Sequence, residues 1–169
     1  MAWHKTSEKS SDYNCIAWAL GFDHILLWPE AAFDMEWPFP RPETCSVADF
    51  AQLFALFGYE RCNTEMYEAG FEKIALYSVT PNSAPEHAAR QLQDGRWTSK
   101  LGGGGIDGIH DALADFPTEE PYNKSCRLYG GARFFFRRPR GQYPSYEQAT
   151  MGMPRDAGAP RIISVGFRR

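Results

Sequence analysis

The sequence predicts an α+β domain in which N-terminal helices pack on a small antiparallel sheet. Helical spacing of apolar residues occurs in the first sixty residues, and short segments bounded by Gly or Pro follow it. The chain has 169 residues, with 15 Gly, 12 Pro and 15% aromatic residues, which indicates many turns around a packed core. This length is sufficient for one domain with a core of its own.

The first predicted helix begins at Cys15 and ends at Gly21. Asn14 or Asp12 can cap its N-terminus, because short polar side chains accept hydrogen bonds from the first free N–H groups of a helix. Cys15 is therefore expected in the first turn. Residues 22–43 contain Trp-Pro pairs and further prolines, so they are predicted to form an irregular aromatic loop.

A second helix is predicted from Thr44 or Ser46 to the stop at Gly58. Its apolar residues recur at the three- and four-residue spacing of one helix face. These residues are Val47, Phe50, Leu53, Phe54 and Phe57. We expect this helix to pack on the first one.

The middle of the chain predicts strands. Residues 73–78 form one, and residues 86–92 and 96–101 form the arms of a hairpin. The Asp94-Gly95 pair between the arms favours a two-residue type I′ turn.

Further along, residues 106–113 are expected to form a short helix and residues 133–137 a strand. Residues 162–167 are a candidate terminal strand.

These elements divide the chain into three parts. Residues 1–10 are polar and expected to be loose, residues 11–138 form the domain, and residues 139–169 form an extension rich in Pro and Gly.

The composition argues against several classes of protein. The net charge of −3 is unlike that of a general nucleic-acid-binding domain, although Arg133–Arg140 mixes basic and aromatic residues; this segment reads more simply as a strand with a basic end. The N-terminus has no apolar stretch typical of a secretory signal, and no segment approaches the length of a membrane span. A cytoplasmic location is therefore predicted, with delivery by another route or association with phage left open.

The cysteines and histidines lack the spacing of metal sites. The cysteines lie at 15, 45, 62 and 126, and the histidines at 4, 24, 87 and 110. We expect reduced thiols, no metal and no cofactor. The run Gly103-x-Gly105-x-x-Gly108 matches a dinucleotide fingerprint, but it follows a hairpin arm rather than the first strand of a βαβ unit.

Cys15 and His87 are the candidates for chemistry. A cysteine in the first turn of a helix faces free N–H groups, which stabilise a thiolate nucleophile. The alternative is that Cys15 is a small buried apolar residue. An imidazole on a strand, such as that of His87, can act as the base that takes the thiol proton, or it can be purely structural.

Several stretches of this sequence resemble a family of small, largely uncharacterised bacterial domains. The most specific are the His-Ala-Ala-Arg-Gln and Trp-Thr-Ser-Lys-Leu-Gly segments. The stretches that carry the resemblance are Tyr13–Gly21, Lys73–Tyr77, His87–Leu92, Asp94–Gly102 and Ile109–His110. The layout, in which the cysteine precedes the histidine, is similar to that of NlpC-like and papain-like thiol hydrolases.

The resemblance implies a papain-like fold with a Cys15–His87 dyad and no established substrate. His110 is the remaining candidate for a third member, and a helix cap or a surface position is its alternative. The oxyanion of the reaction would be held by the backbone N–H of Cys15 and a donor from Asn14 or Tyr13.

The predicted type I′ turn fixes which hairpin residues face His87. It places Thr98 and Lys100 on the face of His87 and Ser99 on the opposite face. Ser99 and Lys100 are expected to line the pocket or to fix the hairpin, and Trp18 is a further candidate for substrate contact. No acidic or amide side chain stands at the usual position of the orienting residue.

Two functions from different classes follow. The first is a Cys-His thiol hydrolase or acyl transferase that acts on a peptide or amide bond through a thioester. The second is a catalytically silent binding or assembly module whose C-terminal extension docks a protein partner.

Overall fold

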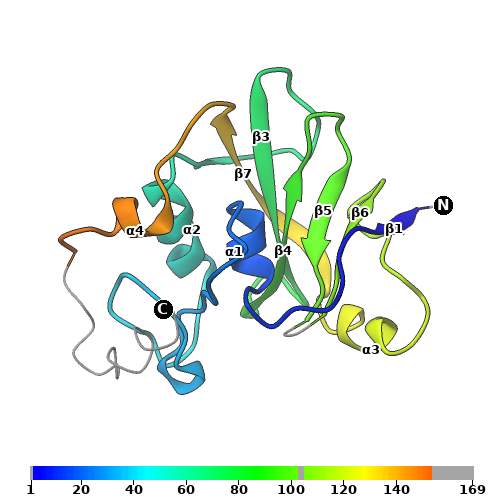
Figure 1. Cartoon of the computed structure of the whole chain (residues 1–169), viewed down its shortest axis with the longest axis horizontal. Helices are drawn as coiled ribbons and strands as arrows, with labels where there is room; N and C mark the ends of the chain where they lie inside the picture. Colours follow the sequence, from blue (N-terminus) through cyan, green and yellow to red (C-terminus); the bar gives the residue numbers. More distant parts are fainter. Residues whose placement is uncertain (1, 103–104, 154–169) are drawn as a thin grey trace.

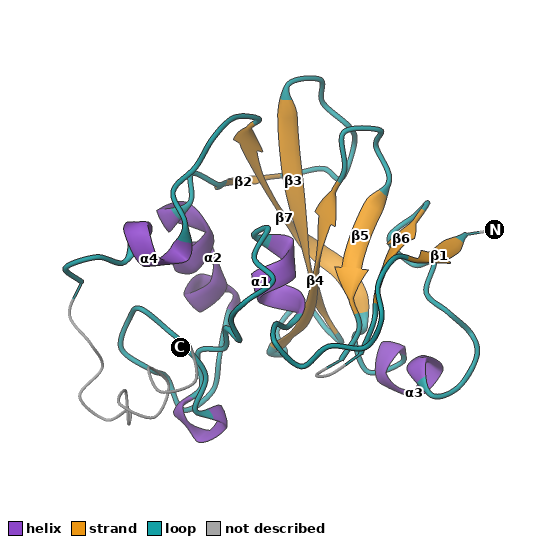
Figure 2. Cartoon of the chain, in the orientation of Figure 1, coloured by secondary structure: helices purple, strands orange, loops and turns teal. Residues whose placement is uncertain are grey.

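Seven β-strands form one antiparallel sheet, with the strand order β1-β6-β5-β4-β3-β7-β2 (Figures 1 and 2). The computed structural model describes residues 2–102 and 105–153. The strands are β1 (Trp3–Lys5), β2 (Glu60–Cys62), β3 (Phe71–Ser78), β4 (Pro85–Gln91), β5 (Trp97–Lys100), β6 (Asp107–His110) and β7 (Gly131–Pro139). Every neighbouring pair in this order is antiparallel.

The predicted papain-like α+β fold, with N-terminal helices on a small sheet, is therefore wrong. The helices are short: α1 (Cys15–Ala19), η1 (Ala31–Phe33), α2 (Val47–Leu56), α3 (Tyr122–Cys126) and α4 (Tyr146–Ala149). The sheet was underestimated because β1 and β2, of three residues each, are too short to show alternation. The helix predicted over residues 106–113 is instead β6 and a turn.

The predicted helices at Cys15 and after Ser46 are confirmed, as are the strand at 73–78 and both arms of the hairpin. The backbone N–H of Ser46 donates to Oδ2 of Asp49 at 2.8 Å, the reciprocal bond of a helix-capping box. These elements were predictable because each carries its own local signal.

Each face of the sheet carries its own hydrophobic cluster. On one face, α1 and α2 pack against Ile74, Leu76 and Ala88, and Figure 1 shows α1 lying across β4. On the other face, Ala75 and Tyr77 pack with residues from the segment between β5 and β7. Alternation along β3 therefore buries both of its faces, which explains its nearly continuous apolar sequence.

A three-residue loop, rather than the predicted type I′ turn, joins β4 to β5. The backbone N–H of Leu92 donates to the carbonyl of Arg96 at 2.7 Å, and Gly95 has a φ of 91°. This is the loop in which a left-handed residue follows a type I turn. Arg90 therefore pairs with Thr98.

The corrected register reverses the predicted faces of β5. A shift of one residue moves every side chain of a strand to the opposite face. Ser99 therefore faces His87, while Thr98 and Lys100 lie on the α1 side.

Both ends of the described chain join the fold. Residues 3–5, predicted to be loose, form β1 and pair with β6. In the predicted extension, Tyr146 of α4 is buried and stacks on Phe57 with ring centroids 6.5 Å apart. The candidate strand 162–167 lies outside the described residues.

The loop geometry makes a prediction for Gly95→Ala. A Cβ at a positive φ is strained, so the substitution should lower the free energy of unfolding by about 1 kcal/mol. Gly141→Ala is the matched control, because a Cβ there meets only one atom, at 4.0 Å. Urea unfolding followed by circular dichroism measures both. Equal stability of the two variants would contradict the left-handed loop.

Candidate active site

Asn14 holds the start of α1 and ties it to the following loop. Its Oδ1 accepts hydrogen bonds from the backbone N–H groups of Ala17 and Leu27, both at 3.2 Å. Its Nδ2 donates to the carbonyl of Leu27 at 2.7 Å and points to Sδ of Met35 at 3.8 Å. The side chain is thus fully used in structure, and in this arrangement it cannot serve as the predicted oxyanion donor.

Cys15 lies at the first position of α1, in the predicted first turn, and it is buried, which the sequence left open as the alternative to a reactive thiol. The backbone of Ala88 in β4 lies close enough to the thiol to lower its pKa. Burial raises the pKa of the thiol to about 11, because the desolvation of a thiolate outweighs the N–H donors and the positive charge of Lys100. At neutral pH the thiol is therefore protonated, and the start of a five-residue helix does not overcome burial.

His87, Ser99 and His110 form a hydrogen-bonded chain across three strands. Nε2 of His87 lies 3.0 Å from Oγ of Ser99, and this oxygen lies 2.9 Å from Nε2 of His110. Nδ1 of His110 lies 2.8 Å from the carbonyl oxygen of Ala112. All three side chains are fully buried. The structure thus brings together three of the residues singled out in the sequence, from β4, β5 and β6.

Aromatic rings enclose both imidazoles. The ring of His87 stacks on Tyr129 with centroids 4.0 Å apart and an interplanar angle of 7°, and Tyr77 meets it edge-on. The ring of His110 stacks on Trp3 at 5.6 Å. Burial lowers the pKa of both histidines, that of His87 well below 6.5, so both are neutral at pH 7.

Cys15 and His87 approach the same peptide of β4 from different clusters. The backbone of Ala88, the residue directly after His87, lies close to the thiol, whereas the imidazole packs with Tyr77 and Tyr129 in the cluster on the other face of the sheet. No hydrogen bond joins the thiol to the ring. Nδ1 of His87 is buried and has no hydrogen-bond partner.

Pairing between β4 and β5 stops close to these groups. The strands pair at Arg90 with Thr98 and at Gln91 with Trp97. Residues 87–89 of β4 and 99–100 of β5 are not paired with each other. We call these two stretches the β4–β5 split. Side chains bridge this split in place of backbone hydrogen bonds.

Lys100 lies at the split on the α1 side. Its Nζ donates to the carbonyls of Ser10 at 2.6 Å and Tyr13 at 3.2 Å, and lies 4.7 Å from the centroid of the Tyr13 ring. The hydroxyl of Tyr13 donates to Oδ2 of Asp107 at 3.1 Å. These contacts anchor the segment before Cys15 on the sheet. They involve Tyr13, a predicted oxyanion donor, and Lys100, a predicted pocket residue, in structural contacts.

Trp18 fastens α1 to β5. Its Nε1 donates to Oγ1 of Thr98 at 3.0 Å, and the hydroxyl of Thr98 donates to the carbonyl of Gly108 at 2.9 Å. The guanidinium of Arg90 lies 5.6 Å from the Trp18 ring centroid. The packing of α1 on the sheet therefore fixes the position of Trp18, close to the predicted site.

Tyr129 and Phe116 are contacts of His87 that sequence reasoning missed. Tyr129 also accepts a hydrogen bond at its hydroxyl from the N–H of Gly102 at 2.9 Å. Both lie in irregular segments outside the strands and helices, so no periodicity marked them.

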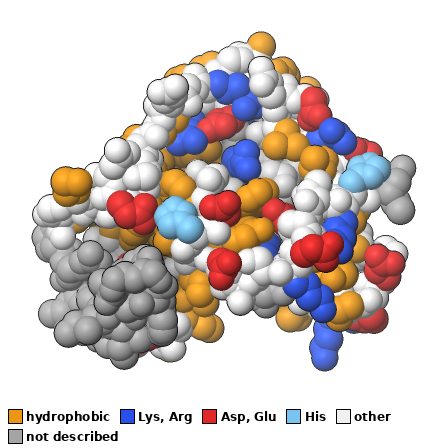
Figure 3. Space-filling model, in the orientation of Figure 1, with side chains coloured by type: hydrophobic (Ala, Val, Ile, Leu, Met, Phe, Trp, Pro, Cys, Tyr) orange, Lys and Arg blue, Asp and Glu red, His pale blue; other side chains and the backbone are white. Residues whose placement is uncertain are grey.

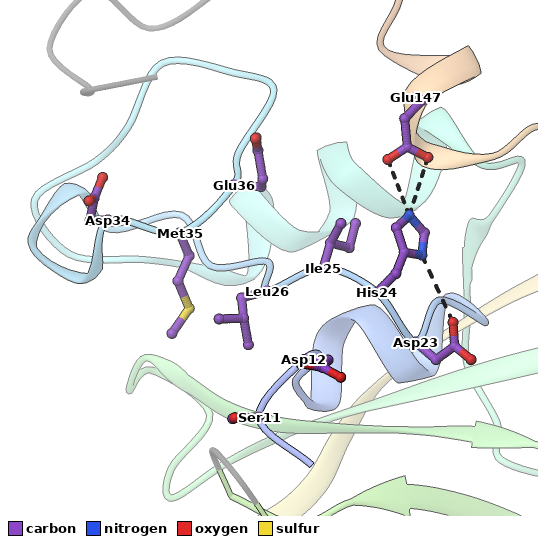
Figure 4. Close-up of a pocket in the computed structure, with 10 residues that line it drawn as sticks. All are labelled: Ser11, Asp12, Asp23, His24, Ile25, Leu26, Asp34, Met35, Glu36 and Glu147. Atoms are coloured by element: carbon purple, nitrogen blue, oxygen red, sulfur yellow. Dashed lines mark hydrogen bonds and ion pairs between the residues drawn. The ribbon is translucent and has the colours of Figure 1, made fainter. Parts of the chain in front are cut away.

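A pocket of about 750 Å³ opens beside α1 (Figure 4). Ser11 and Asp12, which shortly precede Cys15, form part of its wall. The other lining residues are Asp23, His24, Ile25, Leu26, Asp34, Met35, Glu36 and Glu147. Nε2 of His24 lies 3.1 Å from Glu147, which links α4 to this wall. Figure 3 shows acidic side chains gathered on this face.

Comparison with known proteins places the chain in a family. The profile of a domain of unknown function, DUF7689, matches residues 4–137. The chain belongs to this family. The match includes Cys15, His87, Ser99 and His110, and nothing in the comparisons links the chain to NlpC-like or papain-like hydrolases. No curated protein and no solved structure matches the chain.

Residues 2–102 and 105–153 contain no group of three or more His, Cys, Asp or Glu side chains arranged to hold a metal ion. The same residues include no helix with the length and apolarity needed to cross a membrane.

The raised pKa of Cys15 predicts a pH dependence of stability. The unfolded thiol ionises near pH 8.5 and the folded thiol near 11, so its contribution to stability is complete below 8.5 and is lost as pH rises towards 11. Relative to Cys15→Ala, the wild type should lose about 1.4 kcal/mol per pH unit in this window. Urea unfolding under reducing conditions at pH 8, 9 and 10 measures the difference. Parallel pH profiles would contradict a buried neutral thiol.

Proposed function

We propose that this protein is a thiol enzyme that cleaves or transfers an acyl group from an amide or peptide bond, with Cys15 as nucleophile and His87 as base. The observation that supports the proposal is the arrangement at Ala88. The backbone of this residue lies close to the thiol, and the adjacent His87 carries a buried ring nitrogen without a partner. A buried acceptor left unpaired is costly and is found at reactive sites.

The two groups are both neutral at rest, which favours general-base catalysis over a preformed thiolate. As sulfur bonds to the substrate carbonyl carbon, Nδ1 of His87 takes the thiol proton. The imidazolium returns this proton to the leaving amine when the C–N bond breaks, which leaves a thioester on Cys15. Water or an acceptor amine then attacks the thioester and releases the thiol.

The reaction requires a rearrangement on substrate binding, because the thiol and the imidazole pack in clusters on opposite faces of the sheet and are not hydrogen-bonded at rest. Catalytic hydrogen bonds often form only in the substrate complex. The pocket beside α1 reaches Ser11 and Asp12, so it gives a substrate a route to the segment before Cys15. The backbone N–H of Cys15, at the start of a helix, is suited to hold the oxyanion.

The setting of the proposed reaction is the cytoplasm. All four cysteines are free, and two of them, Cys15 and Cys45, are buried. Reduced thiols are the usual state in that compartment. The proposed substrate is accordingly a cytoplasmic peptide or amide.

A second candidate function, a silent binding module, is favoured by the burial of the nucleophile. A thiol with a pKa of about 11 is inert unless a neighbouring base acts on it. In this alternative the C-terminal extension docks a protein partner, and the polar groups at the β4–β5 split only hold the sheet.

Acylation by p-nitrophenyl acetate separates the two functions. The proposal predicts rapid release of one p-nitrophenol per chain and an acetyl group on the Cys15 peptide in mass spectrometry. His87→Phe, which keeps a ring of similar size against Tyr129, should slow this step by about 100-fold or more, the usual contribution of a general base.

Cys62→Ala is the matched control, because Cys62 is partly exposed and lies on β2, away from the β4–β5 split. This variant should acylate at Cys15 like the wild type. If Cys15 is acetylated no faster than Cys62, or equally fast without His87, the enzyme function is wrong and the silent module stands.

A further inference from the structure

The hydrogen-bond chain fixes the proton positions on both imidazoles. The carbonyl of Ala112 can only accept, so Nδ1 of His110 must carry a proton. A neutral His110 then has a lone pair on Nε2, and the hydroxyl of Ser99 donates to it. The oxygen of Ser99 in turn accepts from Nε2–H of His87.

The opposite arrangement requires an extra charge. If Ser99 donated to His87, its oxygen would have to accept a hydrogen bond from Nε2–H of His110. His110 would then carry protons on both nitrogens and be a cation. It is enclosed by Trp3 and Phe116 in an apolar cluster, where burial lowers its pKa. The negative charges of Asp115 and Asp111 raise the pKa of His110, but burial outweighs them and the net shift is downward, so the cation is disfavoured there.

We infer that Ser99 and His110 are positioning residues that hold His87 with its proton on Nε2 and the lone pair on Nδ1. Their catalytic importance rests on the proposed function, whereas the tautomer does not. Nδ1 is the ring nitrogen nearer to the backbone of β4, the strand on which the helix of Cys15 packs. The hydrogen-bond chain from His110 through Ser99 therefore leaves the basic lone pair of His87 on Nδ1, the ring nitrogen that has no hydrogen-bond partner.

The same hydrogen-bond chain can also stabilise His87 when its ring becomes charged. When Nδ1 accepts the thiol proton, Nε2 keeps its own proton and its hydrogen bond to Ser99. The dipole of Ser99, oriented by His110, stabilises the positive imidazolium. No proton moves through Ser99, so its role is to orient the ring and not to relay a proton.

Long-range ¹H–¹⁵N NMR spectra of the imidazoles read the tautomers directly. In the wild type we expect Nε2–H on His87 and Nδ1–H on His110. His110→Phe removes the acceptor for the Ser99 hydroxyl, which can then donate to His87, so the His87 proton should move to Nδ1. His110→Gln offers an amide oxygen to Ser99 and should restore Nε2–H. A wild-type spectrum with Nδ1–H on His87 overturns the inference whether or not the variants fold.

Acetylation of Cys15 tests the catalytic part. His110→Phe should slow it by at least about 10-fold and His110→Gln should recover it, since removing an orienting partner costs part of a general base's effect. Ser78→Ala is the matched control: it removes a buried hydroxyl at the end of β3, which donates only to the local carbonyl of Thr80, and should leave the rate unchanged.

The outcomes keep the two proposals apart. Wild-type acetylation that does not depend on His87 refutes the proposed function, while the NMR spectra still decide the tautomer. Acetylation that depends on His87 but is unchanged in His110→Phe, with an unchanged tautomer, refutes the inference and leaves the function standing.

Discussion

The register of β4 against β5 is the constraint on which the site depends. The three-residue loop, closed by the N–H of Leu92 on the carbonyl of Arg96, sets Arg90 opposite Thr98. Because side chains alternate along a strand, this pairing determines on which face of the sheet each later residue of β5 lies. Ser99 therefore falls between two histidines of neighbouring strands. With a loop one residue shorter, Thr98 and Lys100 would lie on that face and Ser99 would point away from both histidines.

The end of pairing between these strands explains why polar groups collect there. Where β4 and β5 no longer exchange backbone hydrogen bonds, the split is bridged by His87 and Ser99 on one side and bordered by Cys15 and Lys100 on the other. Buried polar groups normally satisfy one another, and here all but one ring nitrogen of the histidine chain do so. That unsatisfied nitrogen, on the strand against which the helix of Cys15 packs, is the structural basis for proposing chemistry at this position.

The sequence predicted the parts of this protein that carry local signals. The cap at Asn14, the helix at Cys15 and the hairpin arms were all readable from composition and spacing. The overall fold was not, because short edge strands such as β1 gain their stability from pairing across the sheet. The sheet face on which Ser99 lies was predicted wrongly for a different reason. Asp-Gly is compatible with two loops of different length, and only tertiary packing selects between them.

The β4–β5 register can be measured by NOE spectroscopy. In the three-residue loop Leu92 and Arg96 form the hydrogen-bonded closing pair, so Gln91 and Trp97 form the next, non-hydrogen-bonded pair, whose α-protons approach closely. We predict a strong Hα–Hα NOE between Gln91 and Trp97. A strong Hα–Hα NOE between Leu92 and Trp97 instead would show the two-residue turn, return Ser99 to the other face, and contradict the account of the site.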